Sequence, residues 1–344
     1  MEREMTMSPR ARLGFVGLGT MGRDLLRETA KNPKAEISAL CDVDPEALQK
    51  AQEILGAAAR QFADYREMLD MGGLDAVVVA VPQHLHAALS IESLNTGCGV
   101  FCEKPMGMNV AECREMAATA ERNRKVLMIG HVLRYINPYK YVLELARSGA
   151  LGRPFAVRLI RTMGKWGSWA RPWRYRRDMC GGLLLEVNVH EIDFMRCILG
   201  RATSAWASGR RFINDEIDYE DFITATISFE DGIGALTTGS CDYLGRYTGE
   251  IYLERGSIYF DSISGTVHVC KANEEKQAIP YAEIEPESEG GVHREMREFV
   301  EAILDEHPVT ISGDEGLRNV EIAEACYRSI QERQPIPLPL TTTT

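Results

Sequence analysis

Three glycines near the start of the chain have the spacing of a phosphate-binding turn. Residues 14–22 read GFVGLGTMG, which fits the pattern G-x-G-x-x-G. The first glycine permits a sharp turn, the second lets a pyrophosphate approach the backbone, and the third lets a helix pack closely on a strand. A helix that begins here directs unpaired N–H groups and the positive end of its dipole toward phosphates. We therefore predict that a dinucleotide is bound by Gly17, Leu18, Gly19, Thr20, Met21 and Gly22.

A carboxylate follows at the distance that such a site requires. Asp42 ends the strand-like run 37–41, about 20 residues beyond the glycine turn, where an acid accepts hydrogen bonds from an adenosine ribose. No Arg or Lys occurs in residues 43–45 to receive a 2′-phosphate. Asp42 therefore predicts NAD rather than NADP as the cofactor.

Two tripeptides close the next two strands of the predicted sheet. Residues 74–81 are nearly continuously apolar, as a buried parallel strand must be, and residues 99–102 form the strand after it. Ligands of such sheets bind beyond the carboxyl ends of the strands. Lys104 is therefore a candidate functional residue, although a plain surface turn is the alternative. The other residues expected at the cofactor crevice are Val81, Pro82, His86 and Glu103.

Residues 183–193 read LLLEVNVHEID and bring three ionisable side chains together. In a single helix, Glu186, His190 and Asp193 would share one face. A metal site could be imagined there, but the seven histidines of the chain offer no second clustered ligand. No metal is therefore expected.

An aromatic and basic segment precedes this stretch. Residues 165–177 read KWGSWARPWRYRR and hold three of the four tryptophans. Aromatic faces beside arginines suit the C–H faces and hydroxyls of a sugar ring, which makes Trp166 and Trp173 candidate substrate contacts. Trp169 belongs to the same hypothesis. An interface loop or a packed arm is the alternative for the whole segment.

Composition limits the possible classes of protein. A chain of 344 residues with 45% hydrophobic and 26% charged residues suits two globular domains. The net charge of −11 argues against a nucleic-acid partner or an anionic membrane surface. No run approaches 18 apolar residues, and residues 1–12 lack the apolar core of a secretory signal. Nine scattered cysteines without a C-x-x-C pair favour reduced thiols in a cytoplasmic protein.

The order of predicted elements indicates an α/β fold with two domains. Strands at 12–16, 37–41, 59–62, 74–81, 99–102 and 126–129 alternate with helices, which predicts a doubly wound parallel sheet in residues 1–130, a Rossmann domain. Residues 131–333 contain a helix at 138–148, a strand at 154–162, and antiparallel strands at 222–229, 234–239, 250–253 and 257–261, with helices again at 293–304 and 316–333. Residues 334–344 form an extended tail.

These pieces resemble the glucose–fructose oxidoreductase/inositol dehydrogenase/MocA family along nearly the whole chain. The matching motifs are Gly17-x-Gly-x-x-Gly22, Asp42, Pro82-x-x-x-His86, Glu103-Lys104-Pro105, Arg134-Tyr135 with Pro138, Trp173-Arg174, Gly181-Gly182, His190 with Asp193, and a closing helix that ends near Ser329. The resemblance implies a Rossmann domain and a C-terminal α/β domain with a large open, mainly antiparallel sheet. It also implies a cis bond before Pro105, catalysis by Lys104 and His190, and sugar or cyclitol substrates.

The same resemblance extends to further site residues. It places Arg174 near the nicotinamide end of the cofactor, and Arg134 and Asp193 near the substrate. Family members commonly carry Asp four residues before the histidine and Gly two before it, where this chain has Glu186 and Asn188. Glu186 is expected to orient His190 or reach the substrate. Asn188 is expected to add a polar group to the pocket and alter hydroxyl recognition.

We favour an NAD-dependent dehydrogenase that acts on a secondary alcohol of a sugar, glycoside or cyclitol. His190 is the predicted base because its ordinary pKa lies near neutrality, whereas Lys104 is normally protonated and suits a donor to the same oxygen. An NAD-recycling glycoside hydrolase and a non-catalytic sensor are the alternatives. The intact Lys104 and His190 count against the sensor. An open sheet with few helices also predicts a homo-oligomer, either a dimer or a tetramer.

Overall fold

The computed structural model describes residues 10–56, 59–167, 170–284 and 289–341. It divides into two compact units. The first unit comprises the chain up to Gly107 together with Ala111–Gly130 and Val292–Gly316. The second comprises Met108–Val110, His131–Gly291 and the chain from Leu317 on. The sequence places residues 131–333 in one second domain, whereas by its packing the segment 292–316 belongs to the first unit.

The first unit is built on a sheet of six parallel strands in the order β3-β2-β1-β4-β5-β6. The strands are β1 (Ala11–Val16), β2 (Ala35–Cys41), β3 (Arg60–Phe62), β4 (Ala76–Val79), β5 (Gly99–Glu103) and β6 (Leu127–Gly130). The central strand β4 is buried along its whole length, as its unbroken apolar run predicts. This order reverses direction at β1, so the prediction of a doubly wound Rossmann sheet is confirmed.

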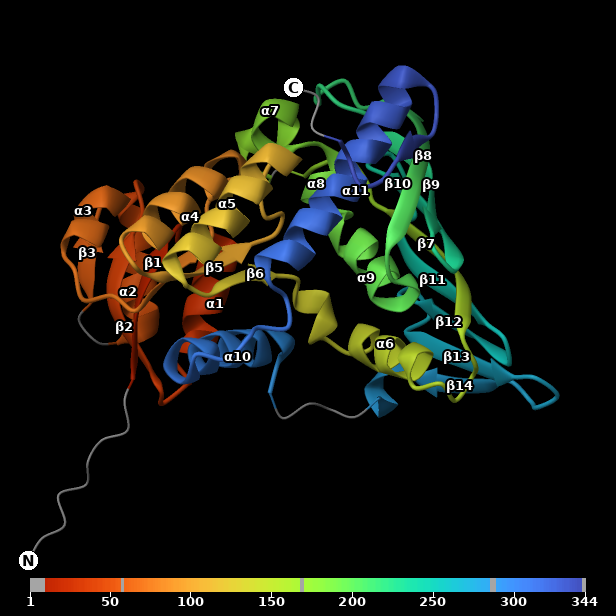
Figure 1. The fold of residues 1–344 in the computed structure, drawn as a ribbon, viewed down its shortest axis with the longest axis horizontal. Coiled ribbons are helices and arrows are strands. Elements are labelled where there is room, and N and C mark those ends of the chain that lie inside the picture. Colours follow the sequence, from red (N-terminus) through yellow and green to blue (C-terminus); the bar gives the residue numbers. More distant parts are fainter. Residues whose placement is uncertain (1–9, 57–58, 168–169, 285–288, 342–344) are drawn as a thin grey trace, which may run out of the picture. The chain divides into compact units, whose positions relative to one another are not determined.

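Helices cover this sheet, and all of them except α10 lie in the connections between its strands (Figure 1). They are α1 (Thr20–Thr29), α2 (Pro45–Leu55), α3 (Tyr65–Asp70), η1 (Gln83–Leu85), α4 (His86–Asn95), α5 (Val110–Asn123) and α10 (Gly291–Asp305). Helix α2 begins with a sequence that favours a helix start, because the Asp44 side chain accepts a hydrogen bond from the N–H of Glu46 and Pro45 occupies the first turn. Helix α10 packs on β5, with the Phe299 ring 5.6 Å from that of Phe101.

The second unit is built on a sheet of nine strands in the order β14-β13-β12-β11-β7-β10-β9-β8-β15. The strands are β7 (Pro154–Thr162), β8 (Ala202–Arg210), β9 (Phe222–Phe229), β10 (Gly232–Gly239), β11 (Arg246–Leu253), β12 (Gly256–Asp261), β13 (Thr266–Lys271), β14 (Gln277–Pro280) and β15 (Ile336–Pro337). Strands β7 and β10 pair in parallel and the other pairs are antiparallel, so the predicted open, mainly antiparallel sheet is confirmed.

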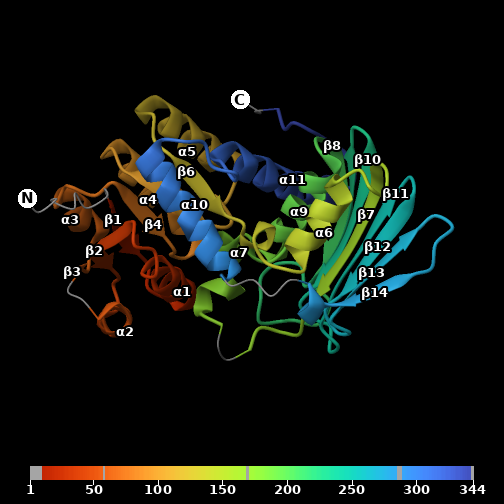
Figure 2. The same cartoon turned by 90° about the horizontal axis from the view of Figure 1, so that it is seen from below.

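One face of this sheet is covered by helices α6 (Tyr139–Arg147), α9 (Val189–Leu199) and α11 (Gly313–Glu332), as Figures 1 and 2 show. The shorter helices of the unit are η2 (Val132–Arg134), η3 (Pro172–Tyr175), α7 (Arg177–Cys180), α8 (Leu183–Glu186) and η4 (Tyr281–Glu283). Within the described part of the second unit, the opposite face of the sheet carries no helix (Figure 2). Among the described residues of the chain, no helix is both long enough and apolar enough to cross a membrane.

The condition for a shared face, one helix over residues 183–193, is not met. Helix α8 ends at Glu186 and α9 begins at Val189. The N–H groups of Val187 and Asn188 both donate to the carbonyl of Leu183, which widens the turn and interrupts the helical register. Asn188 then occupies the N-cap position of α9 with φ −95° and ψ 0°. Glu186 is therefore not one helical turn below His190.

Residues 334–341 are extended, as their proline-rich sequence predicts. Arg333 adopts a φ of 56° directly after the helix, and Ile336–Pro337 then pairs with β8 as the edge strand β15. This pairing covers the exposed edge of the large sheet.

Candidate active site

Packing within the chain explains two of the three glycines in the turn after β1. Gly17 has a φ of +88°, and a Cβ there would lie 2.4 Å from the carbonyl oxygen of Ala80. A Cβ on Gly22 would lie 1.9 Å from the carbonyl oxygen of Gly17. A Cβ on Gly19 would meet no atom of the chain within 4 Å. The first and third glycines are therefore required by packing, whereas the second keeps the backbone bare at the N-terminus of α1.

Asp42 is bound to this turn. One carboxylate oxygen accepts a hydrogen bond from the N–H of Leu18 at 2.7 Å, and the other accepts from the N–H of Asp44 at 2.9 Å. A carboxylate has about four acceptor positions, so both oxygens keep capacity for ribose hydroxyls. The side chain of Arg23 holds the turn from the other side by donating to the carbonyl of Leu18 at 2.6 Å.

The segments after β4 and β5 are joined through a buried histidine. Strands β1, β4 and β5 are neighbours, so their carboxyl ends lie on one edge of the sheet. His86 is 1% exposed, with Nδ1 lying 2.7 Å from the carbonyl oxygen of Pro105 and Nε2 lying 2.9 Å from that of Val81. The bond between Lys104 and Pro105 is cis, as the family resemblance implies. His86 thus ties the Lys104 turn to the end of β4, which also contacts Gly17 through Ala80.

The acid beside Lys104 has a second acid near it. Glu103 is buried and accepts a hydrogen bond from the N–H of Lys104 at 3.1 Å. Glu295 of α10 is fully buried, and neither of its carboxyl oxygens has a hydrogen-bond partner among the described residues. Burial, and then the charges of Glu103 and Glu298, raise the pKa of Glu295 well above its usual range. This burial and the neighbouring acids favour the uncharged form of Glu295.

In the second unit, His190 lies in the first turn of α9 and is 9% exposed. Asp193, one turn further, receives two hydrogen bonds from Arg134, from Nε at 2.8 Å and from Nη2 at 2.5 Å. Burial favours a higher pKa for Asp193, but any positive charge on His131 and the hydrogen bonds from Arg134 and Asn319 hold that pKa at about 2. Two residues predicted as separate substrate contacts, Arg134 and Asp193, are therefore bound to each other.

Sequence reasoning missed two polar side chains of this cluster. His131 follows β6 and is fully buried, with its ring 5.7 Å from that of His190. Asn319 of α11 is also fully buried and donates to Asp193 at 2.8 Å. His131 and Asn319 are 188 positions apart, so no local pattern indicates their contact. Each residue gave only an isolated signal. His131 is a histidine at the end of a predicted buried strand, and Asn319 is an amide within an apolar helix.

Glu186 and Asn188, the two residues that differ from the family pattern, both have hydrogen-bond partners within the second unit. Glu186 is buried and accepts a hydrogen bond from Nε of Arg174 at 2.7 Å. The Arg174 guanidinium lies 4.2 Å from the ring centre of Trp173. Asn188 is fully buried, and its amide nitrogen donates to Glu191 at 3.0 Å. Asn188 therefore faces a buried acid, and Glu186 pairs with the arginine predicted to lie at the cofactor.

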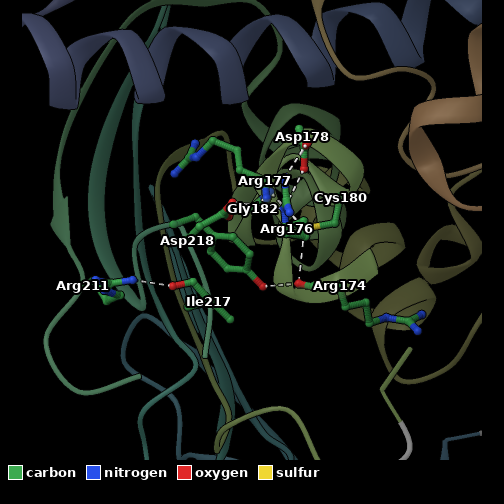
Figure 3. Close-up of polar contacts among 10 residues, drawn as sticks. Arg174, Arg176, Arg177, Asp178, Cys180, Gly182, Arg211, Ile217 and Asp218 are labelled. Atoms are coloured by element: carbon green, nitrogen blue, oxygen red, sulfur yellow. Dashed lines mark hydrogen bonds and ion pairs between the residues drawn. The ribbon is translucent and has the colours of Figure 1, made fainter. Parts of the chain in front are cut away.

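The described residues of the arm, 165–167 and 170–177, contact the loop before β9. Trp166 is 6% exposed, and its indole N–H donates to the hydroxyl of Tyr219 at 2.7 Å. That hydroxyl donates to the carbonyl of Arg174 at 2.6 Å, while the N–H of Arg177 donates to Asp218 (Figure 3). These contacts favour the packed-arm alternative for Trp166. The prediction for Trp169 falls outside the described residues.

The first unit fits a bound dinucleotide. The bare backbone at Gly19, the N-terminus of α1 and the carboxylate of Asp42 are the groups that a pyrophosphate and a ribose require. Within the described residues, no group of three or more His, Cys, Asp or Glu side chains is arranged to hold a metal ion.

Comparison with known proteins agrees with this geometry. Residues 11–131 match the family model described as "Oxidoreductase family, NAD-binding Rossmann fold", and residues 139–259 match the "GFO/IDH/MocA C-terminal domain". The chain belongs to the GFO/IDH/MocA family of NAD-dependent oxidoreductases.

Relatives and solved structures match along nearly the whole chain. Myo-inositol 2-dehydrogenase of Thermotoga maritima is 24% identical and covers 95% of this chain and 98% of its own length. Levoglucosan dehydrogenase, solved with NADH and L-sorbose, superposes with a TM-score of 0.86 at 21% identity over 97% of this chain and 100% of its own. The WlbA dehydrogenase of Bordetella pertussis, solved with NADH and UDP-GlcNAcA, gives a TM-score of 0.83 at 24% identity over 96% and 100% of the two chains.

Adding a methyl group at Gly22 or at Gly19 should affect different properties, the stability of the fold in the first case and NAD binding in the second. Gly22→Ala should lower the free energy of unfolding by about 1–3 kcal/mol, because its Cβ overlaps the Gly17 carbonyl. Gly19 has a φ of −63°, which alanine adopts freely, so Gly19→Ala should change stability by less than about 0.5 kcal/mol. Gly19→Ala should nevertheless weaken NAD binding by about tenfold or more, because the methyl group blocks the approach of the pyrophosphate.

Thermal unfolding followed by circular dichroism and calorimetric titration with NAD measure the two effects. Equal loss of stability in both variants, or full NAD affinity in Gly19→Ala, would contradict the assignment of packing to Gly22 and of ligand approach to Gly19.

Proposed function

We propose that this enzyme oxidises a secondary alcohol of a sugar or cyclitol to the ketone with NAD, or catalyses the reverse reduction. Family membership supports the reaction type. The names of relatives, myo-inositol 2-dehydrogenase and levoglucosan dehydrogenase among them, support the substrate class. In this proposal the first unit binds the dinucleotide, and the second unit binds the substrate and forms the oligomer.

One observation in the first unit carries the proposal. His86 bridges the ends of β4 and β5, so the glycine turn and the Lys104 turn are fixed on one edge of one sheet. Lys104 is half-buried there, and its turn is braced by Glu103. A surface turn without function would not need a buried histidine between two backbone carbonyls.

Oxidation of the alcohol removes a proton from oxygen and a hydride from carbon. Bound NAD supplies the acceptor for the hydride. A ring nitrogen of His190 accepts the hydroxyl proton, because imidazole is largely unprotonated near neutrality. The Lys104 ammonium donates a hydrogen bond to the same oxygen and stabilises the negative charge that develops on it.

The remaining predicted residues have supporting roles in this proposal. Arg174 contacts the nicotinamide end of the cofactor, and its hydrogen bond to Glu186 fixes the direction of its side chain. Trp173 supports the Arg174 guanidinium with its ring and contributes an apolar surface toward the sugar. Asp193 supports α9 one turn beyond His190 through its pair with Arg134.

The direct test is the appearance of NADH absorbance when the protein and NAD are mixed with a panel of sugars, cyclitols, uronates and glycosides. At least one member should produce NADH in a protein-dependent manner. Release of an aglycone from a glycoside without NADH accumulation would contradict the proposed reaction.

His190→Ala should lower kcat by roughly 10²–10⁴, as expected for the loss of a general base, with the Kd for NAD unchanged. Lys104→Ala should cause a similar loss, and Lys104→Arg should fail to restore kcat because a guanidinium places its donors differently. His307→Ala, in the loop after α10, is the matched control and should leave kcat unchanged. Near-normal turnover of folded His190→Ala at saturating substrate would remove this mechanism.

Wild-type protein should prefer NAD to NADP by roughly 5- to 150-fold in kcat/KM, equivalent to about 1–3 kcal/mol, since the Asp42 carboxylate repels a 2′-phosphate. Asp42→Asn keeps an oxygen that can accept from Leu18 but removes the charge, so it should narrow the preference while retaining the fold. Steady-state kinetics with both cofactors measure the ratio. Equal or better efficiency of the wild type with NADP would refute the role of Asp42.

We also propose a homo-oligomer formed through the helix-free face of the nine-stranded sheet. Ile233, Ala156 and Tyr252 lie directly opposite one another on β10, β7 and β11, and they point away from the helices. Ile233 is 57% exposed and Trp206, on the same face of β8, is 44% exposed. Exposed apolar side chains grouped on one sheet face are typical of a protein interface.

Light scattering at micromolar concentration should give a mass of at least two chains for the wild type. Ile233→Lys should lower this mass, because a charged side chain would be buried without a partner in the interface. Ile263→Lys is the matched control: Ile263 is 65% exposed in the turn after β12, outside the proposed interface, and its replacement should leave the mass unchanged. A monomeric wild type would exclude the proposed oligomer.

A further inference from the structure

A buried polar cluster in the second unit contacts the proposed base through His131 without being part of the proposed chemistry. Four of its side chains are fully or nearly fully buried, with exposed fractions of 0% for His131 and Asn319, 2% for Asp193 and 9% for Arg196. Arg134 completes it through its two hydrogen bonds to Asp193. The members come from the end of β6, from η2, from α9 and from α11. Buried polar groups in such number define a single arrangement when every contact is satisfied.

The orientation of the Asn319 amide is fixed by two charges of opposite sign. Its oxygen accepts a hydrogen bond from Nη1 of Arg196 at 2.7 Å, and its nitrogen donates to Oδ1 of Asp193 at 2.8 Å. A flipped amide would set oxygen against carboxylate and nitrogen against guanidinium, and both contacts would become repulsive. The two charges therefore hold the amide nitrogen on the side of Asp193 and the amide oxygen on the side of Arg196.

The same nitrogen determines the state of His131. It lies 3.1 Å from Nε2 of His131, and it has a second hydrogen to donate in that direction. Nε2 must then be the acceptor, which leaves the ring proton of neutral His131 on Nδ1. Asn319 thus selects one tautomer of His131.

His131 in turn meets the ring of His190. The two ring centres are 5.7 Å apart and the planes are inclined by 84°, an edge-to-face contact. Asp193, which anchors Asn319, is three residues beyond His190 on the same helix. The network therefore fixes both the helix that bears His190 and the ring against which it rests.

We propose that His131 is a positioning residue for His190, held uncharged and in one tautomer by Asn319. The inference rests on the proposed role of His190 as the base. When His190 accepts the substrate proton, a neutral neighbour adds no second positive charge beside it. The Asp193 carboxylate attracts a proton on His131, but the hydrogen bonds that it receives from Arg134 and Asn319 oppose this attraction. The charge of Arg196 faces the amide oxygen of Asn319. A charged His131 would oppose that proton transfer.

The tautomer of His131 can be measured by spectroscopy, without an activity assay. The full-length protein is labelled with ¹⁵N-histidine and studied by long-range ¹H–¹⁵N spectroscopy at neutral pH, with His131→Phe to assign the signal. His131 should show a protonated Nδ1 and an unprotonated Nε2. Asn319→Leu, which removes the donor, should convert this signal to a mixture of tautomers. A proton on Nε2 of His131 in the wild type, or a doubly protonated ring, would overturn the proposal.

Kinetics test the consequence for His190. His131→Phe keeps an aromatic ring of similar size but loses the acceptor for Asn319, so kcat should fall roughly 10- to 100-fold from misplacement of the base. The Kd for NAD should be unchanged, because His131 is not among the proposed cofactor contacts, and the one such contact in the second unit, Arg174, pairs with Glu186. The midpoint of the acid limb of the kcat profile should move by about half a pH unit or more, which a purely structural defect would not cause.

His190→Ala separates the proposed catalytic role from the positioning role. If His190→Ala retains near-normal turnover, the proposed function of His190 is wrong. If His190→Ala is inactive while folded His131→Phe keeps the wild-type kcat and pH profile, the positioning role alone is overturned.

Discussion

The first unit depends on one close backbone contact, between the turn at Gly17 and the end of β4. With a Cβ position only 2.4 Å from the Ala80 carbonyl oxygen, this turn tolerates no side chain at Gly17. The contact decides where the chain leaves β1, where α1 begins, and which N–H groups face outward at the helix N-terminus. Asp42 then accepts from Leu18 within the same turn, so the carboxylate that we propose to set the cofactor preference also holds the shape of the loop.

The second unit depends on a different constraint, the need to satisfy buried charge. Removing Asp193 and Arg134 from water costs several kcal/mol per ion, and only good geometry with additional hydrogen bonds offsets that cost. Two contacts from Arg134 and one from Asn319 supply this geometry at Asp193. Because such a network is destabilising when partly satisfied, it favours one position of α9 over its alternatives. We attribute the placement of His190 to this requirement as much as to apolar packing.

The sequence predicts the elements that rest on local pattern. The apolar run of β4, the glycine spacing at 17–22 and the cap of α2 by Asp44 each have their causes within a few residues, and the structure contains all three. The strand predicted at 154–162 likewise matches β7 in both limits. For the site, sequence and resemblance name Lys104, His190 and Asp193, and the cis bond before Pro105 is present.

What the sequence does not predict depends on contacts between distant positions. The interruption between α8 and α9 follows from two N–H groups sharing the carbonyl of Leu183, and the helical spacing of residues 183–193 contains no sign of it. The pairing of His131 with Asn319 joins the end of a strand to the last helix. Glu295 has the helical spacing of an ordinary surface acid, yet the packing of α10 on the sheet buries it completely.

Each of the two residues that differ from the family pattern, Asn188 and Glu186, has a charged hydrogen-bond partner in the second unit. At position 188 an amide replaces the usual glycine, and its nitrogen reaches Glu191, which is itself paired with Arg161 of β7 at 2.9 Å. That pairing raises the pKa of Arg161 and ties the start of α9 to the sheet. At position 186 the longer acid reaches Arg174. Both changes therefore add polar contacts between α8 or α9 and the segments around them. Each added contact restrains the segment that bears His190.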